Sequence, residues 1–415
     1  MAVCELVEES PGSHRCRTCR RGWRGSPGRR ECHGPVEIAT QKPRPSHESE
    51  PVLPIVQKTR VGLLLPNWCR GGVERYHEAL FRWTPQIEWS GLALTSRSAT
   101  YLPSLMQLSR QMPVFCDSTV SNSDAPSSGV TVTRSERESI ERLVDRSDAL
   151  VTWAVSDLSA VRRFPGPVIT VSHGDGDWLR DRLHPSCESA THFVSVSAAA
   201  SMAFPEKFMD RVTVIPGGIE LDRIAPSRSR EEVRQSWGVH DNQIAVGFVG
   251  RFSPEKNPLQ AAKIVGKLGP RAIAIYHGHN PWGEPEFRKQ ATEAAGGRIK
   301  FIGPEDCHTG DVYAGIDCLV QASPSEGGPL VAMESWLSGV PLITTPVGIL
   351  LDDVDLAARS FVVSLSDPLA IWCESVLGAI SMPVQQKWEA QRIAAERYSA
   401  AAAGQRWQKY LKAIT

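Results

Sequence analysis

Short apolar runs alternate with helix-like patterns along most of the chain after residue 58, and this alternation restricts the fold more than any other feature. Each run has the length of a buried strand, and most are followed by a loop and then by apolar residues at helical spacing. Such alternation is typical of parallel sheets whose faces are covered by helices. The runs that we interpret as strands are 60–66, 92–95, 149–152, 168–171, 193–197, 244–249, 272–276, 299–302, 317–320 and 341–344.

The length of 415 residues exceeds the usual size of a single core, so two globular domains are expected. The strand–helix pattern is repeated in the second half, and a seam is expected between Pro216 and Ser236, where two glycines precede a charged stretch. We therefore predict an α/β protein of two Rossmann-like domains, at 58–220 and 221–384, followed by C-terminal helices at 385–415.

Residues 1–57 differ in composition from the rest of the chain, because they are rich in arginine and proline and have almost no apolar periodicity. This composition favours disorder. Cys16 and Cys19 have the spacing of a zinc-ligand pair, but Cys32 and His33 are adjacent and form a poor second pair. A disordered basic tail, or an extension upstream of the true start, is the favoured interpretation. A zinc or nucleic-acid element in this tail is the alternative.

Charge and hydropathy argue against several classes of protein. Lys and Arg total 46, as do Asp and Glu, so the net charge gives no reason to expect a nucleic-acid partner. No apolar run approaches the roughly 18 residues of a spanning helix, and the N-terminus has no recognisable secretory signal. Single cysteines scattered through the globular part are typical of a reducing compartment, and we therefore expect a cytoplasmic protein.

One segment of the second half carries two carboxylates eight residues apart, Glu326 and Glu334. Gly327, Gly328 and Pro329 lie between them, at the expected start of a helix. Proline suits the first helical turn, and the glycines offer backbone N–H groups at the positive helix end, where an anion can bind. One carboxylate can then bind the hydroxyls of a sugar and the other a second polyol, with a phosphate between them. A sugar-nucleotide site requires this layout.

A loop at 250–258 follows the strand predicted at 244–249 and contains Arg251 and Lys256. Ligands of parallel sheets bind at such carboxyl-terminal strand ends. Both side chains could reach a diphosphate, arginine as a fork and lysine as a point charge. Two basic residues in a loop usually form solvated surface, but together with the Glu326 segment they predict phosphate binding.

The order of these motifs resembles the donor half of the family-4 retaining glycosyltransferases. The motifs that carry the resemblance are Gly250-Arg251-x4-Lys256, Phe301-Ile302-Gly303, Tyr313-x3-Asp317 and Glu326-x7-Glu334. The first half is similar to the same family through Gly71-Gly72-Val73-Glu74, Ser172-His173-Gly174 and 214–220. The resemblance covers about residues 59–410. It implies the GT-B architecture, in which two Rossmann-like domains face each other across a cleft, with a C-terminal helix returning to the first domain.

The resemblance also implies roles for the residues of the Glu326 segment. Glu326 is implied to bind hydroxyls of the donor sugar near its reacting carbon, and Glu334 to hold the ribose of the nucleotide. Gly327, Gly328 and Leu330 are implied to present backbone N–H groups to the sugar and the phosphate.

Arg251 and Lys256 are implied to neutralise the diphosphate and to stabilise the leaving group, which is electrostatic catalysis by fixed donors. No Asp-x-Asp motif lies within the loop at 250–258 or the Glu326 segment. The resemblance therefore implies a transfer that needs no metal and no cofactor. Gly71 and Gly72 are implied to let a loop of the first domain close over the phosphates. His173 is implied to orient the sugar or the acceptor, and the alternative is a histidine packed beneath its own loop.

We therefore predict retaining transfer of a sugar from a nucleoside-diphosphate sugar to a hydroxyl acceptor, in polysaccharide, glycolipid or glycoconjugate biosynthesis. The acceptor could be a sugar, a lipid-linked sugar or a small molecule, selected by acceptor-side loops such as 117–128. Peripheral contact of the protein with the inner membrane face is left undecided by the sequence. A nucleotide-sugar epimerase and a non-catalytic sugar-nucleotide-binding protein of the same fold are the alternatives. Some positions depart from the family pattern, among them Asn257, where the family has glycine after the lysine.

Overall fold

The computed structural model describes residues 58–415 apart from 69–70, 96–101, 118–129, 156, 175 and 279–284, together with short strands between residues 2 and 32. The chain divides into two compact units, Met1–Val56 and Gln57–Thr415.

The described part of the first unit consists of short antiparallel strands. They are β1 (Ala2–Val3), β2 (Leu6–Ser10), β3 (Ser13–Cys16), β4 (Gly22–Arg24) and β5 (Glu31–Cys32). β1 pairs with β5, and β3 pairs with both β2 and β4. The sequence favoured disorder in this segment and did not predict these strands. Its connecting residues, including Cys19 and His33, lie outside the described part of the chain, so the disorder and zinc interpretations stay predictions.

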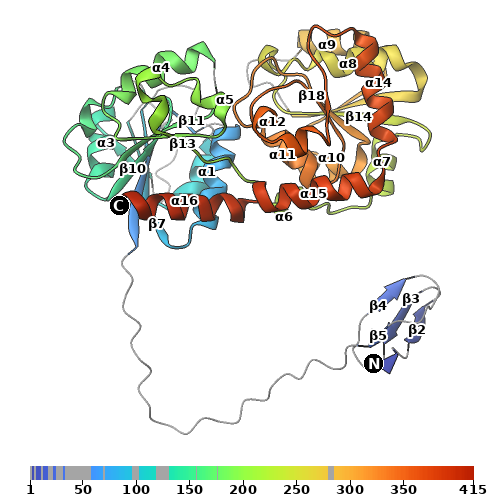
Figure 1. Cartoon of the computed structure of the whole chain (residues 1–415), viewed down its shortest axis with the longest axis horizontal. Helices are drawn as coiled ribbons and strands as arrows, with labels where there is room; N and C mark the ends of the chain where they lie inside the picture. Colours follow the sequence, from blue (N-terminus) through green and yellow to red (C-terminus); the bar gives the residue numbers. More distant parts are fainter. Residues whose placement is uncertain are drawn as a thin grey trace. The chain divides into compact units, whose positions relative to one another are not determined.

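The first domain of the second unit is built on a parallel sheet with the strand order β13-β12-β11-β10-β6-β7-β8-β9 (Figure 1). Its strands are β6 (Thr59–Leu65), β7 (Ile87–Leu94), β8 (Val114–Asp117), β9 (Val130–Thr133), β10 (Ala149–Thr152), β11 (Val168–Ser172), β12 (His192–Ser195) and β13 (Val212–Val214). Successive side chains of a strand point to opposite faces, so Leu63 packs in one core and Leu64 in another. Burial on both faces explains the continuous apolar runs in the sequence.

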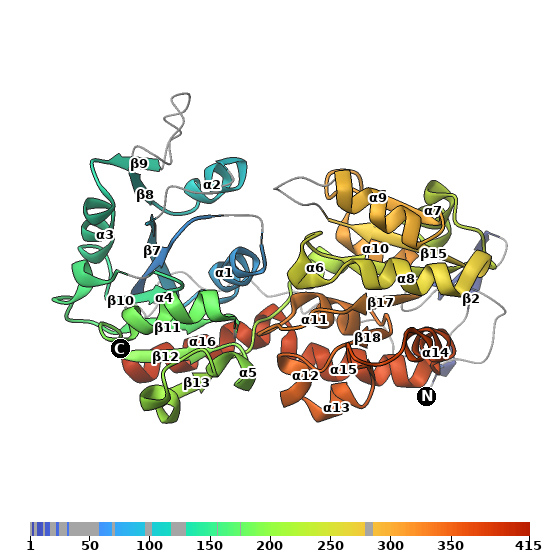
Figure 2. The same cartoon turned by 90° about the horizontal axis from the view of Figure 1, so that it is seen from above.

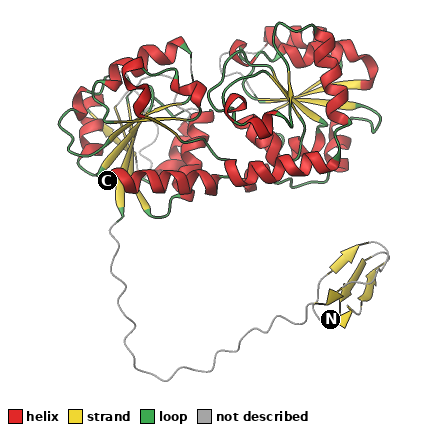
Figure 3. Ribbon diagram, in the orientation of Figure 1, coloured by secondary structure: helices red, strands yellow, loops and turns green. Residues whose placement is uncertain are grey.

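Helices cover both faces of this first sheet, as Figure 3 shows. They are α1 (Gly72–Trp83), α2 (Leu102–Ser109), α3 (Glu136–Val144), α4 (Asp177–Cys187) and the short α5 (Ala198–Ser201). Apolar residues of α1 and α2 join the core of Leu63, and those of α3 join the core of Leu64. Helix α1 thus follows β6, as the alternation of strand and helix patterns predicts, whereas α2 and α4 were not predicted.

The second domain repeats this arrangement on a parallel sheet with the order β16-β15-β14-β17-β18-β19. Strands β15, β17 and β18 of this sheet are labelled in Figure 2. Its strands are β14 (Ile244–Val249), β15 (Ala272–His277), β16 (Ile299–Ile302), β17 (Cys318–Gln321), β18 (Leu342–Thr344) and β19 (Phe361–Val362). Its helices are α6 (Leu221–Ile224), α7 (Arg230–Trp237), α8 (Leu259–Leu268), α9 (Pro285–Ala294), α10 (Thr309–Gly315), α11 (Leu330–Leu337), α12 (Ile349–Asp352), α13 (Val354–Ala357) and α14 (Leu369–Ile380).

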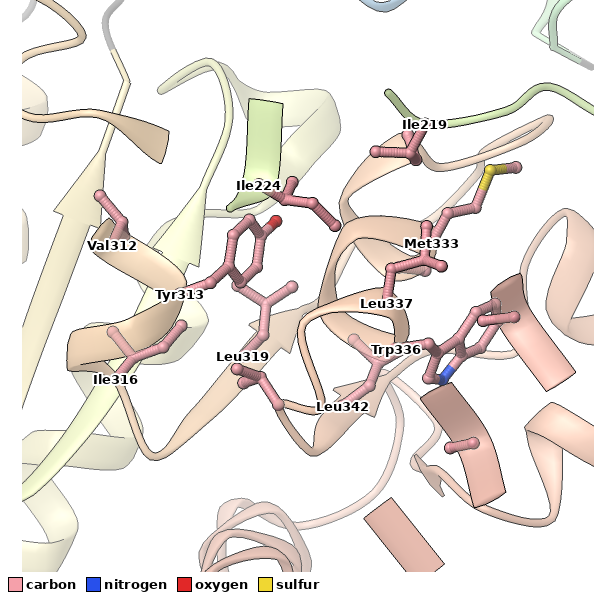
Figure 4. Packing of buried hydrophobic residues seen from close by; sticks show 14 of the residues in the cluster. Ile219, Ile224, Val312, Tyr313, Ile316, Leu319, Met333, Trp336, Leu337 and Leu342 are labelled. Carbon is pink, nitrogen blue, oxygen red and sulfur yellow. The ribbon is translucent and has the colours of Figure 1, made fainter. Parts of the chain in front are cut away.

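One of the cores of the second domain joins α6, α10 and α11. Figure 4 shows Tyr313 of α10 beside Ile224 of α6, with Met333 and Trp336 of α11 in the same cluster. These side chains are buried, so the cluster fixes the three helices against the sheet. The carboxylate of Glu334, which α11 carries, is therefore held on a rigid element.

The chain crosses between the two domains twice, and the two crossing segments are hydrogen-bonded to each other. The Ile219 N–H donates to the Tyr398 carbonyl at 2.8 Å, and the Ala400 N–H donates to the Ile219 carbonyl at 2.9 Å. Helix α15 (Val384–Tyr398) packs on α11, and α16 (Ala400–Ile414) packs on α1 of the first domain. There Trp407 is buried and donates a hydrogen bond to the Tyr76 hydroxyl. The predicted return of a C-terminal helix to the first domain is thus confirmed.

Candidate active site

The second sheet has its topological switch point between β14 and β17. The chain runs outward from β14 through β15 to β16, and then returns to β17 on the other side of β14. Ligands of open parallel sheets bind outside the carboxyl ends of the strands at such a point. The loops that follow these two strands contain Arg251 and Lys256 in one case and Glu326 in the other. The fold therefore brings together the two motifs that the sequence pattern singled out.

The loop after β14 presents Lys256 at the end of a single 3-10 turn, Pro254–Lys256. The next residue, Asn257, has a φ of 44° and a ψ of 52°, which is the left-handed conformation. Glycine adopts this conformation without strain, and asparagine is among the few other residues that tolerate it. The departure of Asn257 from the family glycine therefore keeps the backbone turn that positions Lys256.

The ammonium group of Lys256 binds the carboxylate of Glu326. Lys256 Nζ lies 2.6 Å from Glu326 Oε1, and Ser323 Oγ donates to the same oxygen at 2.7 Å. The Glu326 side chain is 11% exposed and that of Lys256 is 28% exposed. A positive and a negative group are thus held side by side at the switch point, and both can be reached by a ligand.

Arg251 forms an ion pair within its own loop. Its guanidinium lies 3.1 Å from Glu255 Oε1, four residues later in the same loop, and both side chains are substantially exposed. The structure joins Lys256 directly to Glu326. The diphosphate contact of Arg251 stays a prediction.

Gly327 lies where the loops of the two domains meet. A Cβ atom on Gly327 would lie 2.3 Å from the carbonyl oxygen of His173, so any larger residue would push the two loops apart. Leu330, at the start of α11, is similarly close to Gly72 and Gly217, because added Cβ atoms there would lie 3.7 and 3.6 Å from its methyl groups. The expected glycine segment thus faces the motifs of the first domain. Helix α11 begins at Leu330, one residue later than predicted.

Glu334 lies on α11 and is only 2% exposed. Tyr313 Oη donates to its Oε2 atom at 2.8 Å, and Arg223 Nε lies 3.2 Å from its Oε1 atom. Neither partner was predicted, because they come from α10 and α6, far away in the sequence. Tyr313 belonged to one of the motifs that resemble the family, but no sequence signal indicated Arg223.

His173 follows β11 and is packed among aromatic rings. Its ring centroid lies 4.6 Å from that of Tyr76, 5.7 Å from that of His77 and 6.0 Å from that of Trp153. Its Nε2 atom is buried and has no hydrogen-bond partner among the described residues. Burial holds the pKa of His173 well below its usual value, so the ring is neutral. The neutral ring suits a role in binding a hydroxyl group better than a role as a cation.

His77 gives the first domain a predictable response to acid. Its Nδ1–H group donates a hydrogen bond to the Val73 carbonyl at 2.8 Å, and burial lowers the pKa of His77 to about 4. The folded state therefore favours the neutral ring, and this stabilisation is present above pH 6.5 and is lost as the pH falls toward 4. We expect His77 to account for about 2 kcal/mol of lost unfolding free energy between pH 7 and pH 5.

Chemical denaturation of the wild type and His77→Gln at both pH values measures this contribution. The wild type should lose more stability on acidification than the variant, whereas the exposed His240→Gln control should behave as the wild type does. Equal pH dependence in His77→Gln and the wild type would contradict the expectation.

The glycines predicted near the phosphates lie at the start of α1. Gly71 precedes the helix with an extended backbone, and Gly72 is its first residue. A Cβ atom on Gly71 would lie 2.8 Å from Glu74 Oε2, so the Glu74 carboxylate folds back over the helix N-terminus, where its charge is favourable. Whether these glycines meet a phosphate stays a prediction.

Within the described ranges, no group of three or more histidine, cysteine, aspartate or glutamate side chains is placed to hold a metal ion. The described helices likewise include none that is long and apolar enough to span a bilayer. The loop at 117–128, which we expected to govern the choice of acceptor, lies outside the described residues apart from Asp117.

Residues 229–370, which include both loops of the switch point, match the family of glycosyl transferases group 1. The second domain is a group 1 glycosyltransferase domain. The family predicted from the motifs is therefore confirmed for this part of the chain. Its cationic loop, Glu326 and Glu334 all lie within the matched range.

Two curated glycosyltransferases are similar to parts of this chain. A putative glycosyltransferase EpsF of Bacillus subtilis is 29% identical over 41% of this chain and 45% of its own length. A D-inositol 3-phosphate glycosyltransferase of Corynebacterium urealyticum is 25% identical over 60% of this chain and 63% of its own length. The chain thus matches about half the length of these relatives.

The fold of the second unit is also found in solved structures of other proteins. Anabaena HepE, crystallised with UDP, aligns with a TM-score of 0.69 and 18% identity, over 86% of this chain and 100% of the HepE chain. The group 1 domain and its partner domain therefore form a GT-B fold, and the predicted fold class is confirmed.

Proposed function

We propose that this protein is a retaining, metal-independent glycosyltransferase. It transfers a hexosyl-type group from a nucleoside-diphosphate sugar to a hydroxyl group and keeps the α configuration. In this reaction the bond between the anomeric carbon and the diphosphate oxygen breaks, a new bond forms to the acceptor oxygen, and the nucleoside diphosphate leaves. The acceptor oxygen attacks from the face on which the diphosphate departs.

The observation that carries the proposal is the pair formed by Lys256 and Glu326 at the switch point of the group 1 domain, with Nζ and Oε1 2.6 Å apart. Glu326 accepts hydrogen bonds from hydroxyls of the donor sugar, while Lys256 is placed to neutralise a phosphate beside that sugar. Arg251 supplies a second cation from the same loop. Gly327, Gly328 and Leu330 offer backbone N–H groups at the start of α11.

The first domain supplies the acceptor side of this site. His173 is neutral, and its loop touches Gly327, so we assign it to orienting the sugar or the acceptor. The contact of Gly72 with Leu330 supports closure of the first domain over the donor. We place the protein in the cytoplasm, where polysaccharide, glycolipid or glycoconjugate precursors are its substrates. Lipid-linked acceptors bring it into peripheral contact with the inner membrane face.

The solved neighbour supports the choice of donor class. HepE has been crystallised with UDP and also with UDP-glucose, and both structures align with this chain at similar TM-scores. A nucleoside-diphosphate sugar is also the ligand to which the Lys256–Glu326 pair is suited, because it combines hydroxyl groups with a diphosphate. We therefore propose this donor class, with UDP-sugars as the first donors to be tested.

A panel of nucleoside-diphosphate sugars tests the proposal, with slow donor hydrolysis and thermal stabilisation as the two readouts. We expect the wild type to hydrolyse one donor, and Glu326→Gln to lower that rate roughly 10- to 100-fold, because a hydrogen bond to a charged group is lost. Glu374→Gln, on the exposed side of α14, is the matched control and should keep the wild-type rate.

Other outcomes of this panel point to other functions. Inversion at a sugar carbon without an acceptor would identify an epimerase, and stabilisation by a donor that no added acceptor turns into transfer would favour a binding protein. If no sugar nucleotide binds at any concentration, the donor site built on Glu326 and Glu334 is wrong.

A further inference from the structure

The carboxylate of Glu334 is held by two side chains to which the proposed function gives no role. Tyr313 Oη donates to one oxygen at 2.8 Å, and Arg223 Nε lies 3.2 Å from the other. A carboxylate that is 2% exposed needs such partners, because an unpaired buried charge is strongly destabilising. Each oxygen of Glu334 therefore has one fixed neighbour, and the orientation of the group is determined.

Tyr313 is the inner of the two partners. It comes from α10 and is buried beside Ile224 and α11, as Figure 4 shows. Burial, with the adjacent charge of Glu334, raises the pKa of Tyr313 well above its usual value, so the phenol keeps its proton and donates at every physiological pH. This contact fixes one oxygen of Glu334 from the side of the core.

Arg223 is the outer partner, since its side chain is 30% exposed. It belongs to α6, which packs against α10 and α11. Its Nε atom is buried and lacks a well-aligned hydrogen bond to any described residue, although it lies close to Glu334. The contact is thus an ion pair in which the guanidinium stays partly exposed.

The position of Arg223 is over the ligand-binding edge of the sheet. His277 ends β15, beside the switch-point strand β14. Burial chiefly, with an additional contribution from the charge of Arg223, lowers the pKa of His277 to about 4. Arg223 also pairs with Glu334 on α11, the helix that follows the switch-point strand β17, and this places it at the edge of the sheet where a nucleotide would be bound.

We propose that Arg223 is a positioning residue for nucleotide recognition. It holds Glu334 so that the carboxylate accepts hydrogen bonds from the ribose hydroxyls of the donor. A carboxylate offers about four lone-pair sites, and the two contacts described leave acceptor capacity on both oxygens. Because the ribose is bound through Glu334, Arg223 affects the affinity for the ribose and not the affinity for the phosphates. This inference rests on the proposed function.

Calorimetric titration with ribonucleotides and their 2′-deoxy counterparts tests the inference. The probes are UDP, GDP, ADP and CDP, each paired with its 2′-deoxy form. For the diphosphate that binds, the wild type should prefer the ribonucleotide roughly 10- to 100-fold, as expected for a hydrogen bond to a charged acceptor. Arg223→Ala should reduce this preference to within about threefold of unity, and Arg223→Lys should restore part of it because its ammonium group can still pair with Glu334.

Arg82→Ala is the matched control. Arg82 forms an ion pair with Glu220 at 2.9 Å, next to α6, but it does not contact Glu334. This control should keep the full preference for ribose. If Arg223→Ala weakens both forms of the nucleotide equally, so that the preference is unchanged, Arg223 has a structural or phosphate-binding role and the inference is overturned.

The inference and the proposed function can fail separately. If the wild type binds a nucleoside diphosphate without preferring ribose, Glu334 does not accept the 2′-hydroxyl and the inference fails, while the proposed donor class survives. If none of the probes binds to the wild type, the proposed function and the inference fall together. Thermal unfolding of each variant shows whether it is folded, and a misfolded Arg223→Ala leaves Arg223→Lys to decide.

Discussion

Replacing Lys256 by alanine is expected to lower the rate of sugar transfer by roughly 10²- to 10³-fold, as for the loss of one fixed electrostatic donor. Lys256 Nζ lies 2.6 Å from Glu326 Oε1, so the substitution also leaves a carboxylate that is 11% exposed without its cation. In the proposed reaction, the leaving diphosphate then develops its charge without the ammonium group of Lys256. The effect should be on kcat more than on KM, since the charge on the leaving oxygen is greatest in the transition state.

Steady-state kinetics with the donor found by the panel measure this effect. Lys263→Ala is the matched control, because Lys263 lies on α8 in the same domain and is exposed. It removes the same charge from the protein without touching the switch point. If the two alanine variants transferred sugar at the same rate, Lys256 would have no part in catalysis.

Trp407→Ala should lower the stability of the protein strongly, by about 3–5 kcal/mol of unfolding free energy. Trp407 is fully buried on α16, packs against Tyr76 at the core of the first domain and donates a hydrogen bond to the Tyr76 hydroxyl. Its removal leaves a cavity and deprives that buried hydroxyl of a donor. Urea denaturation followed by far-UV circular dichroism measures the change.

Trp388→Ala provides the comparison for Trp407. Trp388 lies on the neighbouring helix α15 but is 68% exposed, so its loss should change the unfolding free energy by no more than about 0.5 kcal/mol. A loss of similar size in both variants would show that α16 is not docked on the first domain as described.

Strong local patterns allowed parts of the fold to be predicted to the residue. Strand β14 has the predicted bounds, because its continuous apolar run is flanked by turn residues. Strand β7 was predicted only from Leu92, since Glu88 and Ser90 interrupt its apolar pattern. Helix α4 was missed because Pro185 lies inside it, and proline in a sequence argues against a helix.

The candidate site shows the same division between local and distant information. Glu326, Lys256 and the glycines could be singled out because each lies within a short motif. Their proximity followed from the rule for parallel strand ends. The partners of Glu334 could not be found in this way, since the contact with Arg223 depends on how α6 packs against α10 and α11. No pattern of residues near Arg223 or Glu334 encodes that packing.

Helix α16 gives the first domain an unusual order of assembly. Domains generally fold as they emerge during synthesis, the N-terminal one first. Here the core around Tyr76 includes Trp407 and Leu411, so the first domain lacks part of its core until residues 400–414 have been made. The group 1 domain can therefore fold before the domain that precedes it in the chain. A nascent first domain exposes the face that α16 later covers.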